Sequence, residues 1–345
     1  MRPVWTALER RSAGPRVATS WTWTGCWLKH YGDVVPHRFA VVRDGADVVG
    51  AALVTASRKG PRAFPVRVLH LGTAGGPADD DVHVERNDLL SVEGRRPHVA
   101  RAVLAELRRA GGWDEISFDG FLPEVLHEAA PELPVESRTE RSWAIRLDPR
   151  RPVEDGLGPS VRRKVRIARN LLGPVGCSVA ETADDGLAML DELVELHQLR
   201  WTGTGSPGAF ASSRRRAFLR DLVATGVPLG EVRLFRLRGA DGTIGVVVGW
   251  VEGRRFCYYQ SGFAIFPDNR MRAGLLCHAV FAETCREQGF SDYDLLAGDY
   301  AYKRQLAGGE GEDLVWARLA RGGARSAVVR VARAARAEVA RRRAP

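Results

Sequence analysis

Two distant segments of the chain show the alternation of apolar and polar residues that is typical of β-hairpins. Residues 38–56 read RFAVVRDGADVVGAALVTA, and residues 232–253 read VRLFRLRGADGTIGVVVGWVEG. Each predicts two strands joined at an Asp-Gly turn. After the second hairpin, RFCYYQSGF predicts a further strand.

A long helix and a short strand follow each hairpin. Apolar residues recur at helical spacing in 96–111 and in 271–290, and each helix ends at glycine. Short strands are then predicted in 111–121 and 291–300. The same order of units occurs twice, which predicts two related α/β modules in tandem.

Proline and glycine are dense in RLDPRRPVEDGLGPS, residues 146–160, which predicts a domain boundary there. We therefore expect a first module at 1–150, a second at 151–320 and a basic, Ala/Arg-rich helical tail at 321–345. Directly after the boundary, 160–170 reads SVRRKVRIARN and predicts a basic helix with Ser160 as its N-cap.

Length and composition predict the kind of protein and its cellular location. The chain has 345 residues, of which 45% are hydrophobic and 27% charged, enough for a globular protein with a full core in each of two domains. It has no apolar run long enough to cross a membrane and no signal-like N-terminus. The sequence therefore predicts a cytoplasmic protein without a transmembrane segment.

The net charge of +9 is concentrated at the C-terminus, where nine arginines and one glutamate follow Trp316. Two functions fit this tail: a solvated helix on its own domain, or contact with nucleic acid or an anionic surface. Only four of the 51 basic residues are lysines, and one of them is Lys303, in the stretch YDLLAGDYAYKRQL.

Common catalytic fingerprints are absent from the sequence. It contains no G-x-x-x-x-G-K-[ST], no H-E-x-x-H and no G-x-S-x-G, which argues against the corresponding NTPases, zinc proteases and serine hydrolases. Five cysteines without a C-x-x-C pair predict buried thiols and no metal site.

Candidate binding residues gather in the second half. The helix end LVELHQLRW brings His197, Arg200 and Trp201 within one turn. Tyr259 and Gln260 lie on the strand CYYQSGF. The group Asp299, Tyr302 and Lys303 follows the strand YDLL, at its carboxyl end, where α/β folds usually place their sites.

These motifs resemble a known family. The order L-H-x-x-R-W, a hairpin with D-G, Y-Y-x-x-G-F, a long helix and Y-D-x-x-x-G-D-x-x-Y-K is similar to the GNAT-like domain of the Fem peptidyltransferases, over about residues 18–315. The resemblance implies two tandem GNAT-like modules, each a mixed sheet flanked by helices. It also implies acyl transfer to an amine, with aminoacyl-tRNA or acyl-CoA as the donor and no permanently bound cofactor.

In the Fem type, an aromatic-Lys pair near the end of the second module contacts the aminoacyl end of the tRNA, and Tyr302-Lys303 matches that pair. The chemistry agrees, because a compact ammonium stabilises the oxyanion that forms when an amine attacks an ester or thioester. Asp299 is the candidate to hold Lys303 or to accept the amine proton. A surface Lys303 paired with Asp299 is the alternative.

Two acyl donors, acyl-CoA and aminoacyl-tRNA, are compatible with the resemblance. Ordinary GNAT enzymes hold the CoA pyrophosphate with a glycine-containing loop at the start of the long helix. Here NRMRAGLL lacks the first glycine and keeps only Gly274, so Arg270 and Arg272 are left as phosphate ligands. This favours aminoacyl-tRNA over CoA. The predicted tRNA contacts lie on the basic helix, at Arg162, Arg163, Lys164, Arg166 and Arg169.

The first module is expected to bind the acceptor, a small amine-bearing metabolite or a cell-envelope precursor. In VHVERNDLL, polar residues alternate with apolar ones, and Glu85 and Asn87 are the candidate contacts, although a half-exposed strand explains them equally well. The sequence thus predicts a Fem-like, tRNA-dependent acyltransferase. The alternatives are a CoA-dependent N-acyltransferase and a non-catalytic nucleic-acid-binding or scaffold protein.

Overall fold

A computed structural model describes the chain except for residues 15, 61–63, 78–79, 131–134, 204 and 323–345. It divides into two compact units, which we describe separately. Unit 1 contains Met1–Ala13, Trp27–Thr139 and the described residues 315–322. Unit 2 contains Gly14–Cys26 and Glu140–Leu314. The predicted tail at 321–345 lies almost entirely outside the described residues.

The unit boundaries differ from those expected from composition. The first module does not end in the Pro/Gly-rich segment near residue 150, because the chain passes from unit 1 into the main part of unit 2 at Glu140, within a strand. From Val315 the chain returns to unit 1, again within a strand. Both crossings occur inside regular β-structure, where no cluster of turn residues signals them in the sequence.

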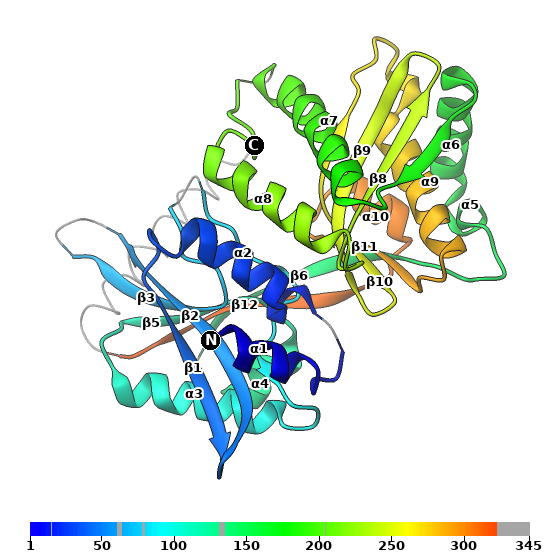
Figure 1. The fold of residues 1–345 in the computed structure, drawn as a ribbon. Coiled ribbons are helices and arrows are strands. Elements are labelled where there is room, and N and C mark those ends of the chain that lie inside the picture. Colours follow the sequence, from blue (N-terminus) through cyan, green and yellow to red (C-terminus); the bar gives the residue numbers. More distant parts are fainter. Residues whose placement is uncertain (15, 61–63, 78–79, 131–134, 204, 323–345) are drawn as a thin grey trace. The chain divides into compact units, whose positions relative to one another are not determined.

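Unit 1 is a mixed sheet with helices packed against it. Its strands run in the order β1-β2-β3-β5-β12, and the short β4 pairs with β2. Helices α1 and α3 pack against β2, and α4 packs against α3 (Figure 1). The bounds are α1 Arg2–Glu9, β1 His37–Asp44, β2 Asp47–Lys59, β3 Val66–Leu71, β4 Leu90–Ser91, α3 Arg96–Ala110, β5 Glu115–Phe121 and α4 Pro123–Ala129. Helix α2 (Trp21–Tyr31) and strands β6 (Val135–Arg146) and β12 (Gly311–Ala320) are divided between the units.

Unit 2 is a mixed sheet with helices on both faces. Its strands run in the order β6-β11-β10-β9-β8-β7. Figure 1 shows α7 and α8 on one side of this sheet and α6 and α9 on the other. The bounds are η1 Val17–Thr19, α5 Val153–Gly156, α6 Pro159–Leu172, β7 Gly176–Val179, α7 Ala183–Thr202, α8 Ser213–Gly226, β8 Val232–Gly239, β9 Gly242–Glu252, β10 Arg255–Phe263, η2 Asn269–Met271, α9 Ala273–Glu287, β11 Asp292–Ala297 and α10 Ala301–Ala307.

The predicted order of elements is confirmed in both units. Each hairpin, β1–β2 and β8–β9, precedes a third strand, a long helix and a strand that pairs in parallel with the third strand. The predicted N-cap of the basic helix is wrong: α6 begins at Pro159 after Gly158, because proline suits the first helical position. Residues 82–90 form no continuous strand; Asn87 makes an isolated bridge to Phe121.

Glycine lets helices approach the sheets closely in both units. A Cβ at Gly50 of β2 would lie 2.3 Å from Val99 of α3. A Cβ at Gly262 of β10 would lie 2.4 Å from the carbonyl oxygen of Leu193 on α7. In unit 2 this contact brings the C-terminal half of α7 directly over the polar part of β10.

Candidate active site

The candidate active site of unit 2 begins where two parallel strands stop pairing. Strands β10 and β11 pair only from Arg255–Asp292 to Cys257–Asp294. Beyond this point β10 has a bulge between Tyr258 and Gln260 in its pairing with β9. Because the two strands are no longer bonded to each other there, their side chains and backbone groups can serve a site.

Lys303 lies beside the free end of β11. It belongs to α10, the turn of helix after the strand, and is only 5% exposed. Its ammonium donates hydrogen bonds to the carbonyl oxygens of Leu296 (3.2 Å) and Ala297 (2.5 Å). The Tyr300 ring centroid is 5.5 Å from Nζ. Lys303 is therefore a buried cation held by backbone carbonyls, and the surface lysine considered from the sequence is excluded.

A distorted segment of β11 supplies these carbonyls. Leu296 has a φ of 59°, in the left-handed region that is costly for a branched residue. Its amide donates to the carboxylate of Asp294 at 2.8 Å, and the same oxygen accepts from Ser142 at 2.7 Å. The register with β6 shifts between Asp294 and Ala297. Asp294 thus fixes the bulge that presents two carbonyls to Lys303.

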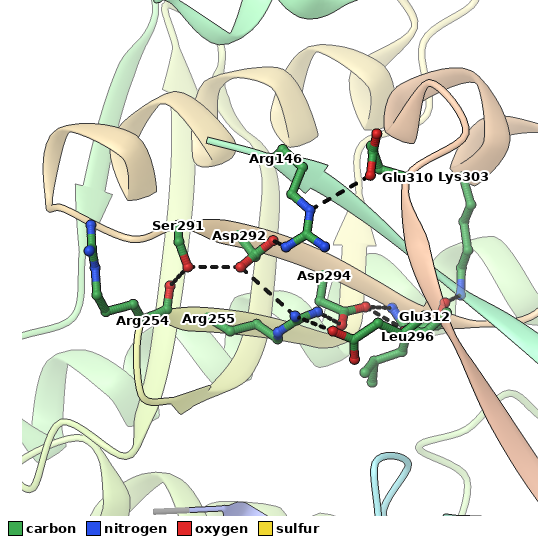
Figure 2. A network of polar contacts seen from close by, with 11 residues as sticks. Arg146, Arg254, Arg255, Ser291, Asp292, Asp294, Leu296, Lys303, Glu310 and Glu312 are labelled. Atoms are coloured by element: carbon green, nitrogen blue, oxygen red, sulfur yellow. Dashed lines mark hydrogen bonds and ion pairs between the residues drawn. The ribbon is translucent and has the colours of Figure 1, made fainter. Parts of the chain in front are cut away.

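A buried ion-pair network holds Asp294 in turn (Figure 2). Arg255 donates to Asp294 at 2.7 Å and to Glu312 at 2.8 Å. Arg146 pairs with Asp292 on the same strand. The Asp294 side chain is fully buried and Arg255 is 11% exposed, so the charges of this pair depend on each other for compensation.

An aromatic cluster adjoins Lys303. The ring of His278, on α9, stacks on Tyr302 at 5.7 Å and contacts Tyr258 edge-on at 5.0 Å. His278 Nδ1 is 2.9 Å from the hydroxyl of Tyr293. Burial and the charge of Lys303 lower the pKa of His278 to about 3. The imidazole is consequently neutral at physiological pH.

Two tyrosine hydroxyls meet in this cluster. The Tyr258 hydroxyl is 2.8 Å from the Ser261 hydroxyl and is also hydrogen-bonded to Tyr302. Burial raises the pKa of Tyr258 and of Tyr302, and the charge of Arg200 lowers both only in part. Both phenols therefore stay protonated, and they can donate hydrogen bonds but cannot act as bases near neutral pH.

The His278 environment gives a testable pH dependence. In the unfolded chain His278 titrates near 6.5, whereas in the fold its pKa is about 3. The unfolded state therefore binds the proton first, and stability is lost as the pH falls from about 6.5 toward 3. We expect His278→Gln to remove up to about 1.4 kcal/mol per pH unit from this slope in urea unfolding. His98→Gln, at an exposed position of α3, is the matched control. A slope for His278→Gln equal to that of the native protein would contradict the neutral, buried imidazole.

Of the predicted donor-binding residues on α7 and β10, Arg200 acts on this cluster through its charge, whereas His197 and Tyr259 pack on other aromatic side chains. His197 is buried, with its ring centroid 4.8 Å from Phe210 and 5.8 Å from Trp201, and burial lowers its pKa. Arg200 is exposed, and its charge reaches Tyr258 and Tyr302. On β10, Tyr259 packs on Trp250 at 4.7 Å and Gln260 is half-buried.

The loop before α9 is not built as a phosphate cradle of the ordinary GNAT kind. Arg270 forms a two-pronged ion pair with Asp268. Arg272 is exposed and has a φ of 40°. At Gly274 an added Cβ would lie 3.3 Å from the ring of Phe263, so this glycine makes room for an aromatic side chain of β10.

Asp299 has a different partner from the one expected. Its carboxylate pairs with Arg304, one turn further along α10, and its side chain is 78% exposed. The residue that secures Lys303 through the backbone is Asp294, five positions earlier. Sequence spacing favoured Asp299 because it is adjacent to the helix of Lys303, whereas the role of Asp294 depends on the bulge in β11.

The basic helix α6 is only partly available to a ligand. Arg162 donates to three backbone carbonyls, of Glu154, Asp155 and Leu157, and Arg169 pairs with Glu154. The amine of Lys164 is 3.5 Å from Gln305. Arg163 and Arg166 are exposed, so these two are the best placed of the five for phosphate contacts.

In unit 1 the two predicted acceptor contacts differ in burial. Asn87 is 5% exposed, and its amide donates to the carbonyl oxygen of Leu71 at 2.9 Å. Its side-chain oxygen accepts from the amide of Asp88. Asn87 therefore ties a loop to the sheet. Glu85 is half-buried beside Gly120.

The comparisons with known proteins agree with this arrangement. Residues 159–304 match the family model of an acetyltransferase (GNAT) domain, and this segment contains Lys303, His278 and both tyrosines of the cluster. Nearly the whole chain superposes on the crystal structure of FemX, with a TM-score of 0.58, 11% identity, and coverage of 92% of this chain and 95% of that one. The chain has a Fem-like fold related to the GNAT acetyltransferases.

Two further solved structures are similar to the chain in fold. The C-terminal domain of a putative lysylphosphatidylglycerol synthetase from Agrobacterium fabrum aligns with a TM-score of 0.55 and 12% identity, covering 94% of this chain and 93% of that one. L-PGS from Bacillus licheniformis aligns with the same score and identity and covers 96% of each chain. No curated protein matches the sequence. The comparisons thus give residues 159–304 as similar to an acetyltransferase (GNAT) domain and the chain as similar in fold to FemX.

Two negative observations apply to the described parts of the chain. Within them, no helix is both long and apolar enough to cross a bilayer. No group of three or more His, Cys, Asp or Glu side chains in these same parts is arranged to hold a metal ion.

Proposed function

We propose that this protein is a Fem-like N-acyltransferase that moves an aminoacyl group from aminoacyl-tRNA to an amine. The observation that carries the proposal is the buried ammonium of Lys303, held on two carbonyls beside Tyr302 within the GNAT-type domain. A fixed cation in a water-poor site suits a reaction in which negative charge develops on a carbonyl oxygen.

The reaction needs few groups. The neutral amine attacks the ester carbonyl, the C–N bond forms, and a tetrahedral oxyanion develops. Its collapse breaks the ester C–O bond, and the proton lost by nitrogen passes to the departing ribose hydroxyl. Lys303 stabilises the oxyanion electrostatically, and the protonated Tyr302 can donate a hydrogen bond to it.

Two observations support the tRNA donor. Phe263 fills the space beside Gly274, and Arg270 is already paired with Asp268, so the loop before α9 offers little to a pyrophosphate. In addition, one structural neighbour is a domain of a putative lysylphosphatidylglycerol synthetase, a name that describes an aminoacylated product. An envelope lipid or precursor and a small metabolite both fit as sources of the acceptor.

The donor is tested in a coupled aminoacylation assay with purified protein, tRNA and an amine acceptor. Ribonuclease treatment should reduce amide formation to the background level, because the donor is destroyed. A mock-treated reaction and one given inhibited ribonuclease are the controls. Full activity after complete digestion of the tRNA would refute the tRNA donor.

A CoA donor is the second candidate, because no side chain caps the N-terminus of α9 and its first amides can face an anion. In that case acetyl-CoA should raise the melting temperature and release thiol when the amine is added. The third candidate, a scaffold that acts through the basic tail, predicts that Lys303→Ala leaves function intact while deletion of residues 323–345 abolishes it.

A further inference from the structure

Unit 1 contains a cavity of about 570 Å³ that the Lys303 cluster of unit 2 does not use. This volume is typical of small-molecule sites. Side chains of β3, β5 and β12 line it, among them His70, Ser117, Asp119 and Arg318. Its lining is polar and charged, although these strands form the centre of the sheet.

The polar lining is arranged in register across the sheet. Thr55 lies opposite His70, His70 opposite Ser117, and Ser117 opposite Arg318. Directly paired residues of neighbouring strands point to the same face. Four adjacent strands therefore place a polar row on one face of the sheet. Thr55, His70 and Ser117 are each no more than 2% exposed, positions that a simple core would fill with apolar residues.

A chain of hydrogen bonds fixes the floor of the cavity. Ser57 Oγ is 2.9 Å from His70 Nε2, and His70 Nδ1 is 2.8 Å from one oxygen of Asp119. The other oxygen accepts from Ser117 at 2.9 Å. Burial alone would raise the pKa of Asp119, but the bonds from His70 and Ser117 bring it below its usual value. Asp119 is thus a carboxylate whose two oxygens are both bound within the protein.

The charged side chains of the lining are of both signs. Lys59, Arg138 and Arg318 contribute three positive charges. Asp81, a second carboxylate of the lining, accepts a hydrogen bond from the amide of Gly76 at 2.8 Å. Glu136 is the third carboxylate and is exposed. Asp119 and Asp81 thus hold hydrogen bonds within the protein, and the cation that lies in the polar row is Arg318.

The cavity also occupies an informative place in the topology. Strands β3 and β5 pair in parallel over three residues, from Val68–Glu115 to His70–Ser117. The helix α3 leads into β5, just as α9 leads into β11 in unit 2. Each unit therefore places charged and polar side chains where a short parallel pair ends, the position at which α/β folds commonly bind ligands.

We propose that the cavity of unit 1 is a second ligand site, which takes a small molecule through a phosphate or carboxylate group bound by Arg318. Arg318 lies in the polar row and is half-buried, so its guanidinium can form a two-pronged contact with either oxyanion. Lys59 and Arg138 add positive charge at the exposed edge, where Arg138 lies 4.9 Å above the ring of Trp316.

Isothermal titration calorimetry on the full chain tests this site with three probes: inorganic phosphate, N-acetylglycine as a carboxylate, and ethanolamine as a cation. We expect phosphate or N-acetylglycine to bind and ethanolamine not to bind. The probe that binds more tightly identifies the oxyanion class. Arg318→Gln should weaken that binding at least about ten-fold, because a charge-assisted contact is lost.

Two further variants make the result specific. Lys59→Gln changes an exposed side chain of the same cavity and should weaken binding by a smaller factor. Arg101→Gln, on the exposed face of α3, should leave binding unchanged. The melting temperature of each variant shows that it is folded. The proposal is overturned if neither oxyanion binds at millimolar concentration, if ethanolamine binds in their place, or if Arg318→Gln and Arg101→Gln behave alike.

Discussion

Replacing Lys303 by alanine is expected to lower kcat for amide formation by about a hundred-fold or more, since loss of a single oxyanion-stabilising group has an effect of this size. The ammonium is 5% exposed and is held by the carbonyls of Leu296 and Ala297. Its removal leaves these carbonyls without their cation and leaves the oxyanion without a fixed charge. The KM for the amine should change little, because the lost interaction belongs to the transition state.

Two controls separate catalysis from folding. Lys29→Ala removes another of the four lysines, an exposed one on α2, and should keep nearly full activity. Lys303→Arg retains the charge but replaces a compact ammonium by a planar guanidinium, so we expect it to remain strongly impaired. Steady-state kinetics with melting curves for each variant checks this. Nearly normal kcat in a folded Lys303→Ala protein would remove Lys303 from the mechanism.

Substitution of Asp294 by asparagine is expected to cost about 3 kcal/mol of unfolding free energy, because it leaves a buried arginine without its countercharge. The Asp294 side chain is fully buried, and its carboxylate binds Arg255, Ser142 and the amide of Leu296. The same change weakens the support of the bulge whose carbonyls hold Lys303. We therefore expect lower kcat together with lower stability.

Urea unfolding of Asp294→Asn beside Asp313→Asn measures this effect. Asp313 is the matched control because its carboxylate is 52% exposed and lies 3.5 Å from Arg141. Such an exposed ion pair contributes little to the free energy of unfolding. We expect a change of about 0.5 kcal/mol or less for Asp313→Asn. Similar losses in the two variants would show that the Arg255–Asp294 pair does not hold the bulge.

The sequence predicted those features that depend on local periodicity. The hairpins β1–β2 and β8–β9 follow from alternation around Asp-Gly, and α3 and α9 follow from helical spacing. The rarity of lysine also drew attention to Lys303. These patterns depend only on residues that are near one another in the sequence, so they can be recognised without knowledge of the fold.

The supporting residues of the site could not be predicted in the same way. Asp294 acts through a bulge in β11 and through Arg255 on the neighbouring strand, and His278 enters from the middle of α9. Nothing in the spacing of these residues indicates contacts between strands. The same holds for His70 and Asp119 of unit 1, which meet only because β3 and β5 are neighbours.

For basic side chains the sequence predicts too many ligand contacts, because it does not show which charges already have partners in the fold. Arg162 and Arg169 look like phosphate ligands on a basic helix. In the structure Arg162 donates to backbone carbonyls at the end of α5, and Arg169 pairs with the carboxylate of Glu154. Arg270 is likewise held by Asp268. Sequence alone counts these charges, whereas the structure shows which of them a carboxylate or carbonyl already occupies.

In the proposed reaction, unit 2 forms an amide from an aminoacyl ester by means of Lys303. Its most direct test follows the label of purified, isotope-labelled aminoacyl-tRNA in a single turnover, with native protein or Lys303→Ala and a primary amine, by mass spectrometry. We expect native protein to transfer the label to the amine as an amide and the variant to do so about a hundred-fold more slowly. Label that stays on the tRNA or appears only as free amino acid with the native protein, or equal rates for the two proteins, would contradict the proposed reaction.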